Sequence, residues 1–461
     1  MPGFSFPFPF FPVQFTKDGV LFQQADAEAL INGLPEGSTD LFVLSHGWNN
    51  NMDAAESLYS GLSAQFAAQI AAAPLKGRSY AICGVLWPSK QFDERELIPG
   101  GAASLNDAVT EDAMRARVSG LADLMQARGW PMEESDRAVQ SRLDALMQAV
   151  GDWEDDPDAR QATVAGLREL LPPHSADAED ASDRFFTMQP ELLLENLSRT
   201  LTPPQILAAG VNASSIDPFA GDPASGLGGA ASFRDVFGGV HASLLHLLNF
   251  TTYYLMKARA GDVGVKGVAP LIEAVRGAHP GLRLHLVGHS FGCRVVTAAV
   301  NALPDDGRLR LSTLTLLQGA FSHNGFASKY DGANDGAFRQ VVARKKVRGP
   351  ILITHTRNDK AVGVAYPIAS RIAGQAAAAL GDENDLYGGL GSNGAQNQNT
   401  TPERVVGTLL DVGGSYPFAA GATSSRPYNL RADAFIAGHS DIVKPQVAYA
   451  VAVALGSPDA A

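Results

Sequence analysis

Short apolar runs recur along the chain, and each of them ends in a turn or a glycine. They are Leu41–Leu44, Tyr80–Leu86, Leu284–Val287, Leu314–Leu317 and Ile351–Thr354. Several are followed by helical spacing of apolar residues, as in Ala298–Leu303 and Gly363–Ala373. Strands that alternate with helices predict an α/β fold: a mainly parallel sheet with helices on both faces. Ligands of such sheets bind at the carboxyl ends of the strands, so the loops after these runs are the places to search.

Residues 91–232 have a different pattern. Segments at 105–128, 134–150 and 159–171 show helical spacing rich in Ala, Leu, Arg and Glu, and no strong strand pattern interrupts them. A Gly, Ala, Ser and Pro-rich stretch at 211–233 ends the block. The pattern predicts a core formed by residues 1–90 and 233–461, with 91–232 as a helical, cap-like or lid-like insertion. Residues 387–401 are polar and of low complexity, which predicts a loop.

Composition narrows the class of protein. The 48 acidic and 36 basic residues give a formal charge of −12, which is unfavourable for binding nucleic acid or anionic membranes. Two cysteines exclude a disulfide framework, and no zinc motif or EF-hand spacing is present, so we expect no metal and no cofactor. Residues 91–200 hold 23 of the acidic residues, which again separates this block from the rest.

No signal peptide is recognisable in the aromatic and proline-rich N-terminal sequence. The stretch 236–256 carries no Asp, Glu, Lys or Arg, but polar side chains interrupt it, so a buried or cleft-facing helix is expected rather than a transmembrane one. The expected location is the cytoplasm, with export by a signal-independent route left open.

The candidate chemistry begins at residues 284–296, where an apolar strand leads into Gly-His-Ser-Phe-Gly and then into a helix. A Gly-x-Ser-x-Gly sequence between a strand and a helix is typical of a nucleophile elbow, in which a strained turn exposes the serine hydroxyl. Ser290 is therefore the candidate nucleophile. Gly288 and Gly292 give the turn the room it needs, and His289 occupies the variable position of the motif.

A serine nucleophile that forms an acyl-enzyme needs donors for the oxyanion. The backbone N–H of Phe291, directly after the serine, is one candidate. The loop after the run at 41–44 supplies a second: His46 and Gly47 turn the backbone, and Trp48 offers its N–H.

The serine also needs a base and an orienting carboxylate. His439 lies on a glycine-led loop before the last apolar helix, 447–455, and is the candidate base. Asp359, on the short loop after the run at 351–354, is the candidate acid, with Asp331, Asp335 and Asp441 as rivals. The order Ser290, Asp359, His439 is the order found in hydrolases of this type.

With these motifs in place, the chain resembles the α/β-hydrolase superfamily, and most of all the bacterial serine-esterase or lipase-like branch with an HG-x oxyanion loop. The matching parts are the Ser-His-Gly-Trp-Asn loop, the segment 85–89, the GHSFG elbow, the Thr-Arg-Asn-Asp loop and the Gly-His-Ser-Asp loop. They cover residues 1–90 and roughly 233–461. The resemblance implies the same triad and oxyanion donors, but none of the motifs names a substrate.

The expected function is hydrolysis of carboxylic esters through an acyl-enzyme, on a small-molecule or lipid ester. The uncharged stretch 236–256 and an insertion that begins close to the carboxyl edge of the sheet favour a covered apolar pocket for medium or longer acyl chains. An acyltransferase with the same triad and a non-catalytic binding scaffold remain alternatives. Ester, thioester and amide substrates, and the oligomeric state, stay open.

Overall fold

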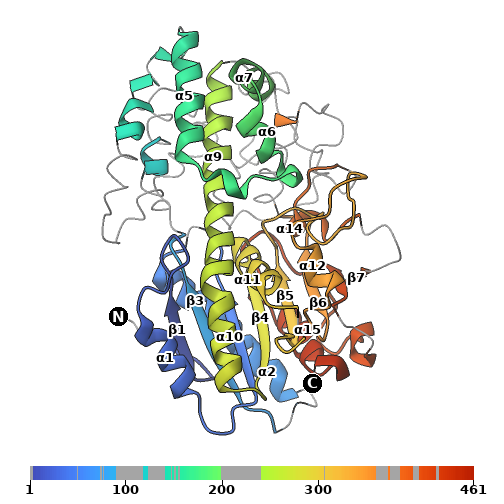
Figure 1. Cartoon of the computed structure of the whole chain (residues 1–461). Helices are drawn as coiled ribbons and strands as arrows, with labels where there is room; N and C mark the ends of the chain where they lie inside the picture. Colours follow the sequence, from blue (N-terminus) through green and yellow to red (C-terminus); the bar gives the residue numbers. More distant parts are fainter. Residues whose placement is uncertain are drawn as a thin grey trace, which may run out of the picture. The chain divides into compact units, whose positions relative to one another are not determined.

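The computed structural model describes residues 4–48, 50–72, 75, 77–89, 118–122, 141–146, 148–149, 152–153, 156–198, 240–305, 307–359, 372–373, 385–397, 404–421 and 425–460. The chain divides into two compact units (Figure 1). The first contains residues 1–89, 259–362 and 389–461, and the second contains residues 90–258 and 363–388.

An eight-stranded sheet, parallel throughout, forms the centre of the first unit. Its spatial order is β1-β3-β2-β4-β5-β6-β8-β7. The predicted α/β class with a parallel sheet is thereby confirmed. The strands are β1 (Phe10–Gln14), β2 (Asp40–Ser45), β3 (Tyr80–Leu86), β4 (Arg283–His289), β5 (Thr313–Leu317), β6 (Ile351–His355), β7 (Val405–Thr408) and β8 (Pro427–Arg431).

Helices connect these strands and cover the sheet. They are α1 (Gln24–Gly33), α2 (Met52–Ala72), α10 (Ala269–Ala278), α11 (Phe291–Ala302), α12 (Arg339–Ala343), α14 (Leu390–Asn393) and α15 (Pro445–Leu455). A π-helical turn, η5 (Val263–Val268), precedes α10, and short 3₁₀ turns occur at η7 (Pro417–Ala420) and η8 (Pro458–Ala460).

The side chains of β2 explain why helices pack on both faces. Successive strand residues point to opposite faces. Phe42 and Leu44 belong to a buried cluster with side chains of α2 and α15. Leu41 and Val43 instead line a small apolar cavity together with side chains of α1 and α10. Because β2 is buried on both faces, it requires an uninterrupted run of apolar side chains.

The register of the central strands brings two loops to one edge of the sheet. Asp40 lies beside Arg283 and Ser45 lies beside Gly288 in the β2–β4 pair. The residues that follow β2 and the residues that follow β4 therefore leave the sheet at the same level. In the β6–β8 pair, His355 lies beside Arg431, so the loops after these two strands also start together.

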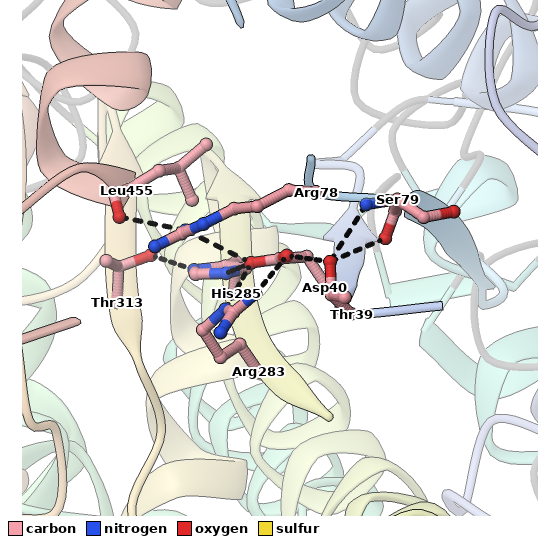
Figure 2. A network of polar contacts seen from close by, with 8 residues as sticks. All are labelled: Thr39, Asp40, Arg78, Ser79, Arg283, His285, Thr313 and Leu455. Atoms are coloured by element: carbon pink, nitrogen blue, oxygen red, sulfur yellow. Dashed lines mark hydrogen bonds and ion pairs between the residues drawn. The ribbon is translucent and has the colours of Figure 1, made fainter. Parts of the chain in front are cut away.

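The opposite edge, where the strands begin, holds a buried charge network (Figure 2). The Asp40 carboxylate accepts hydrogen bonds from Nε and Nη2 of Arg283, at 2.9 and 3.0 Å, and from Nε2 of His285 at 3.0 Å. Arg78 donates to Asp40 at 3.3 Å and to the carbonyl of Leu455 at 3.0 Å, so the network also holds the end of α15. Burial alone would raise the pKa of Asp40, but the hydrogen bonds from His285 and Arg283 outweigh it and lower that pKa well below its usual range.

In the second unit, the regular elements among the described residues are helical. They include α5 (Pro157–Leu170), η3 (Pro173–Ser175), η4 (Ala178–Asp180), α6 (Ser182–Thr187), α7 (Pro190–Ser198) and most of α9 (Val240–Asp262). Their apolar side chains share one buried cluster around Trp153, Phe185 and Leu247. Inside the unit, the ammonium of Lys257 lies 2.8 Å from Asp177 and 2.7 Å from Asp180.

The division into units differs from the expected boundaries at two places. The expected insertion, 91–232, falls within the second unit, but residues 233–258 and 363–388 belong to that unit as well. The physical reason is packing, because Leu244 and Leu248 of α9 and also Ile372 and Tyr387 join its buried cluster. The stretch expected at 211–233 lies outside the described residues, as do most of 105–128 and most of 363–373.

The polar stretch 387–401 contains the short helix α14, and Leu390, Gly391 and Ala395 in it are buried. The stretch 236–256 falls largely within α9, and its described apolar side chains are mostly buried. Among the described residues, no helix combines the length and apolar character that crossing a membrane demands.

Candidate active site

Ser290 occupies a sharp turn between β4 and α11. Its φ of 57° and ψ of −125° are costly for any residue with a side chain. The N–H of Ser290 donates to the carbonyl of Leu317 on β5, which holds the turn against the neighbouring strand. The hydroxyl therefore stands at the carboxyl edge of the sheet, beside the N-terminus of a twelve-residue helix.

The two glycines of the motif leave the turn no spare room. A Cβ atom on Gly288 would lie 2.5 Å from the backbone nitrogen of Cys293. A Cβ atom on Gly292 would overlap the carbonyl oxygen of Ser45, at the end of β2. Both positions thus require glycine for close packing, and the second brings the elbow directly against the loop after β2.

His439 and Asp359 complete a continuous chain of hydrogen bonds from Ser290. Nε2 of His439 lies 2.7 Å from Oγ of Ser290, and Nδ1 of His439 lies 2.9 Å from Oδ2 of Asp359. The carboxylate of Asp359 is fully buried, and the imidazole is partly exposed. The structure thus brings all three predicted residues together although they are separated by up to 149 residues in sequence.

The β6–β8 pairing explains how the acid meets the base. Asp359 lies on the loop after β6 and His439 on the loop after β8. Side chains cross between these loops: Thr356 donates to the Asp433 carboxylate at 2.9 Å, and the Asn358 amide donates to the carbonyl of Ile436 at 2.9 Å. These contacts fix the spacing between the two loops.

The three rival carboxylates have other partners. Asp331 accepts hydrogen bonds from the backbone of Ala333 and Asn334, within its own turn. Asp335 accepts one from the backbone of Lys329, and Asp441 forms an ion pair with Lys444 at 2.7 Å.

The loop after β2 lies directly on the nucleophile. A Cβ atom on Gly47 would fall 2.5 Å from the Cβ of Ser290, so the backbone at 47 passes close to the serine. The rings of Trp48 and Phe291 meet edge to face, with centroids 6.3 Å apart. The two predicted oxyanion donors therefore lie beside Ser290: Trp48 on the loop after β2 and Phe291 at the start of α11.

His46 is the buried anchor of this loop. The backbone N–H of Trp87 donates to Nε2 of His46 at 3.3 Å, so the ring proton resides on Nδ1, which lies 2.9 Å from the carbonyl of Gly47. The backbone N–H of His46 donates to the hydroxyl of Tyr59 at 2.8 Å. Burial lowers the pKa of His46 to about 4, so the ring is neutral at physiological pH.

His289 connects the elbow to the base loop. Its Nε2 donates to the carbonyl oxygen of His439 at 2.9 Å, and the two rings lie 5.0 Å apart. Burial, helped by the nearby His439, lowers the pKa of His289 to about 3. His289, at the variable position of the motif, is thus a neutral hydrogen-bond donor that fixes the backbone of His439 through its carbonyl oxygen.

Sequence reasoning missed Gln318 and Gly391, which surround the acid. The amide of Gln318 lies 3.4 Å from Oδ2 of Asp359 and 3.2 Å from the carbonyl of Gly391. A Cβ atom on Gly391 would lie 2.8 Å from the same Oδ2. Neither residue belongs to a recognisable motif; the signal available was a glutamine directly after an apolar strand, which is weak.

Cys293 is an inert packing residue. Its thiol is fully buried and donates to the carbonyls of Gly288 and Leu317, at 3.1 and 3.4 Å. Burial raises the pKa of this thiol well above its ordinary value. Within the residues that the structure describes, no group of three or more His, Cys, Asp or Glu side chains is arranged to hold a metal ion.

Comparison with models of known protein families, with curated proteins and with solved structures finds no match to this chain. What the site can do is therefore inferred from its own geometry. A serine hydroxyl, an imidazole and a buried carboxylate in hydrogen-bonded sequence form an arrangement suited to nucleophilic catalysis.

Proposed function

We propose that the chain is a serine hydrolase of the α/β-hydrolase type that cleaves carboxylic esters. The single observation that carries this proposal is the hydrogen-bonded chain Ser290–His439–Asp359, with distances of 2.7 and 2.9 Å. The strained backbone of Ser290 on a strand-to-helix turn adds to it, because such strain persists where it serves function.

In the proposed reaction, Oγ of Ser290 attacks the acyl carbonyl while Nε2 of His439 takes the hydroxyl proton. Asp359 stabilises the imidazolium through Nδ1. The backbone N–H groups of Trp48 and Phe291 are proposed to stabilise the oxyanion. When the intermediate collapses, the bond to the leaving alcohol breaks and the imidazolium returns the proton to that alcohol.

Deacylation repeats these steps with water in place of the serine. His439 accepts a proton from water, the hydroxide attacks the acyl carbon, and the Ser290–acyl bond breaks. The proton then returns to Oγ, so the products are a carboxylic acid and an alcohol and the enzyme is unchanged.

The proposed acyl group is of medium or longer chain length. The support is the half-buried ring of Trp48 on the loop beside the nucleophile, which packs edge to face on the buried ring of Phe291. Acyl transfer to an alcohol and a non-catalytic binding role remain the alternatives. One labelling and hydrolysis experiment distinguishes all three functions.

The experiment is labelling of the intact protein with a fluorophosphonate, followed by hydrolysis of p-nitrophenyl esters of increasing chain length. Labelling and turnover that both depend on Ser290 support the proposal. A chain that takes neither label nor ester would favour the binding role, and label with turnover only in the presence of an added alcohol would favour transfer.

A further inference from the structure

Gln318 has a backbone conformation that its residue type does not favour. It follows the last residue of β5 directly, is fully buried and has a φ of 50°. Glycine adopts this left-handed region freely, whereas a residue with a side chain pays free energy for it. Strain at a buried glutamine suggests that the side chain performs a task at this position.

The amide of Gln318 is oriented by its neighbours. Its Oε1 accepts a hydrogen bond from the hydroxyl of Thr354 at 2.8 Å. Its Nε2 faces the carbonyl of Gly391 at 3.2 Å, which can only accept. Two independent partners therefore assign the oxygen and the nitrogen of the amide to the same orientation.

The remaining partner of this nitrogen is the candidate acid. Nε2 of Gln318 lies 3.4 Å from Oδ2 of Asp359, the oxygen that also accepts from Nδ1 of His439. Gly391 closes the other side, because its backbone leaves no space for a side chain next to that oxygen. The carboxylate oxygen thus receives one donor from the base and one from Gln318.

We infer that Gln318 is a positioning residue for the Asp359–His439 pair, and that its amide both orients the carboxylate and withdraws negative charge from it. The inference rests on the proposed function. Because a carboxylate that donates less charge to the imidazole stabilises the imidazolium less, Gln318 keeps the base available at lower pH.

Several other ionisable groups lie near the Asp359–His439 pair. Burial lowers the pKa values of His46 and His289 to about 4 and about 3, and raises that of Cys293, so these groups stay neutral between about pH 5 and 9. On the described parts of the loops after β6 and β8, the charged groups include Arg357, Asp433, Asp441 and Lys444. His355, at the end of β6, is neutral at physiological pH because burial lowers its pKa to about 4.

The test measures kcat/KM against pH with a p-nitrophenyl ester for the full chain and for Gln318→Glu and Gln318→Met. The glutamate keeps the shape and the acceptor for Thr354 but places a second carboxylate beside Asp359. We expect its acid limb to move to higher pH by about one unit. The methionine removes the donor without adding charge, so a smaller shift in the same direction is expected, with kcat reduced on the order of tenfold.

Gln396→Glu is the matched control. Gln396 is also a buried glutamine, but its side chain bonds to Asn393 and Arg404. The same chemical change there should leave the pH profile in place. Thermal unfolding of each variant separates a fold defect from a change at the site.

The possible outcomes separate this inference from the proposed function. An unlabelled, inactive wild type would overturn both. If the wild type is active and both Gln318 variants show the same acid limb of the kcat/KM–pH profile as the wild type, the positioning role of Gln318 is overturned and the proposed function stands. If Gln318→Glu does not fold, the kcat/KM–pH profile of Gln318→Met alone tests the positioning role. Failure of both to fold would also overturn the inference, because Gln318 would then serve folding.

Discussion

The backbone of Gly47 lies so close to Ser290 that an added Cβ would stand 2.5 Å from the serine Cβ and 3.0 Å from its hydroxyl oxygen. The loop after β2 and the nucleophile elbow therefore fit together only if residue 47 has no side chain.

Replacing Gly47 by alanine should move one of these two segments. We expect Gly47→Ala to lower kcat/KM for an ester by at least about 100-fold, since misplacement of about 1 Å at a reacting centre has that cost. The matched control is Gly277→Ala on α10, where an added Cβ meets open space. That variant should keep full activity, and comparable loss in both would contradict the explanation.

Ser290 should be required for covalent labelling but not for folding. Ser290→Ala is expected to abolish labelling by a fluorophosphonate with the far-UV spectrum unchanged. Ser290→Gly should in addition raise the free energy of unfolding by about 1 kcal/mol, because glycine relieves the strained φ of 57°. Ser440→Ala, on the exposed part of the base loop, is the control. Full labelling of Ser290→Ala would remove Ser290 from the mechanism.

The identity of the acid can be tested with isosteric amides. Asp359→Asn should reduce kcat by about 10⁴-fold, because the imidazolium loses its charged partner and the ring its correct tautomer. Asp331→Asn and Asp441→Asn should each retain activity within about threefold, since their hydrogen bonds lie in their own turns. A crippling effect of either, with a mild effect at Asp359, would reassign the acid.

Buried neutral histidines should make the protein sensitive to acid. The folded-state pKa values of His46 and His289 are lowered by burial from 6.5 to about 4 and about 3. Below pH 6.5 the unfolded chain therefore binds more protons than the folded chain. The contribution of the two neutral histidines to stability is complete above pH 6.5 and is lost as the pH falls towards their folded-state pKa values. We expect Tm to fall between about pH 6.5 and 4, with a loss on the order of 3 kcal/mol per histidine.

Substitution of single histidines separates the acid sensitivity caused by the buried histidines from that of other titrating groups. Asp180 in the second unit acts in the opposite direction, because burial raises its pKa to about 6. His289→Gln should flatten the dependence of Tm on pH, whereas His174→Gln, at an exposed position, should not change it. Equal slopes in wild type and His289→Gln would exclude His289 as a source of acid sensitivity.

The network at Asp40 should stabilise the fold without affecting the site. Asp40→Asn leaves Arg283 and Arg78 without a buried counter-charge, which typically costs about 3–5 kcal/mol. Urea unfolding measures this loss, and the fraction that stays folded should label normally at Ser290. Asp53→Asn, on the exposed first turn of α2, is the control and should cost less than about 1 kcal/mol.

The sequence predicted those features that depend on short stretches of chain. The run Leu41–Leu44 lies in β2 because a strand covered on both faces must be apolar throughout, and the glycines around Ser290 reflect local packing. Gln318 could not be found in this way, since its role depends on Asp359 and Gly391, 41 and 73 residues away. The division into units differs from the expected boundary at 233 for the same reason: residues 236–256 form one uncharged stretch in the sequence, but side chains of α9 pack into the buried cluster of the second unit, which extends to residue 258.

Asp40 and its partner His285 are 245 residues apart along the chain. A ribosome that adds about 5–20 residues per second needs about 10–50 s to pass from one to the other. During that time β2 can pair with β3 on one side, while its other side, which β4 will later occupy, has open hydrogen-bonding groups and apolar side chains. Between synthesis of β3 and synthesis of β4, the nascent chain therefore carries an open edge on a central strand, which is the kind of edge that can pair with another chain.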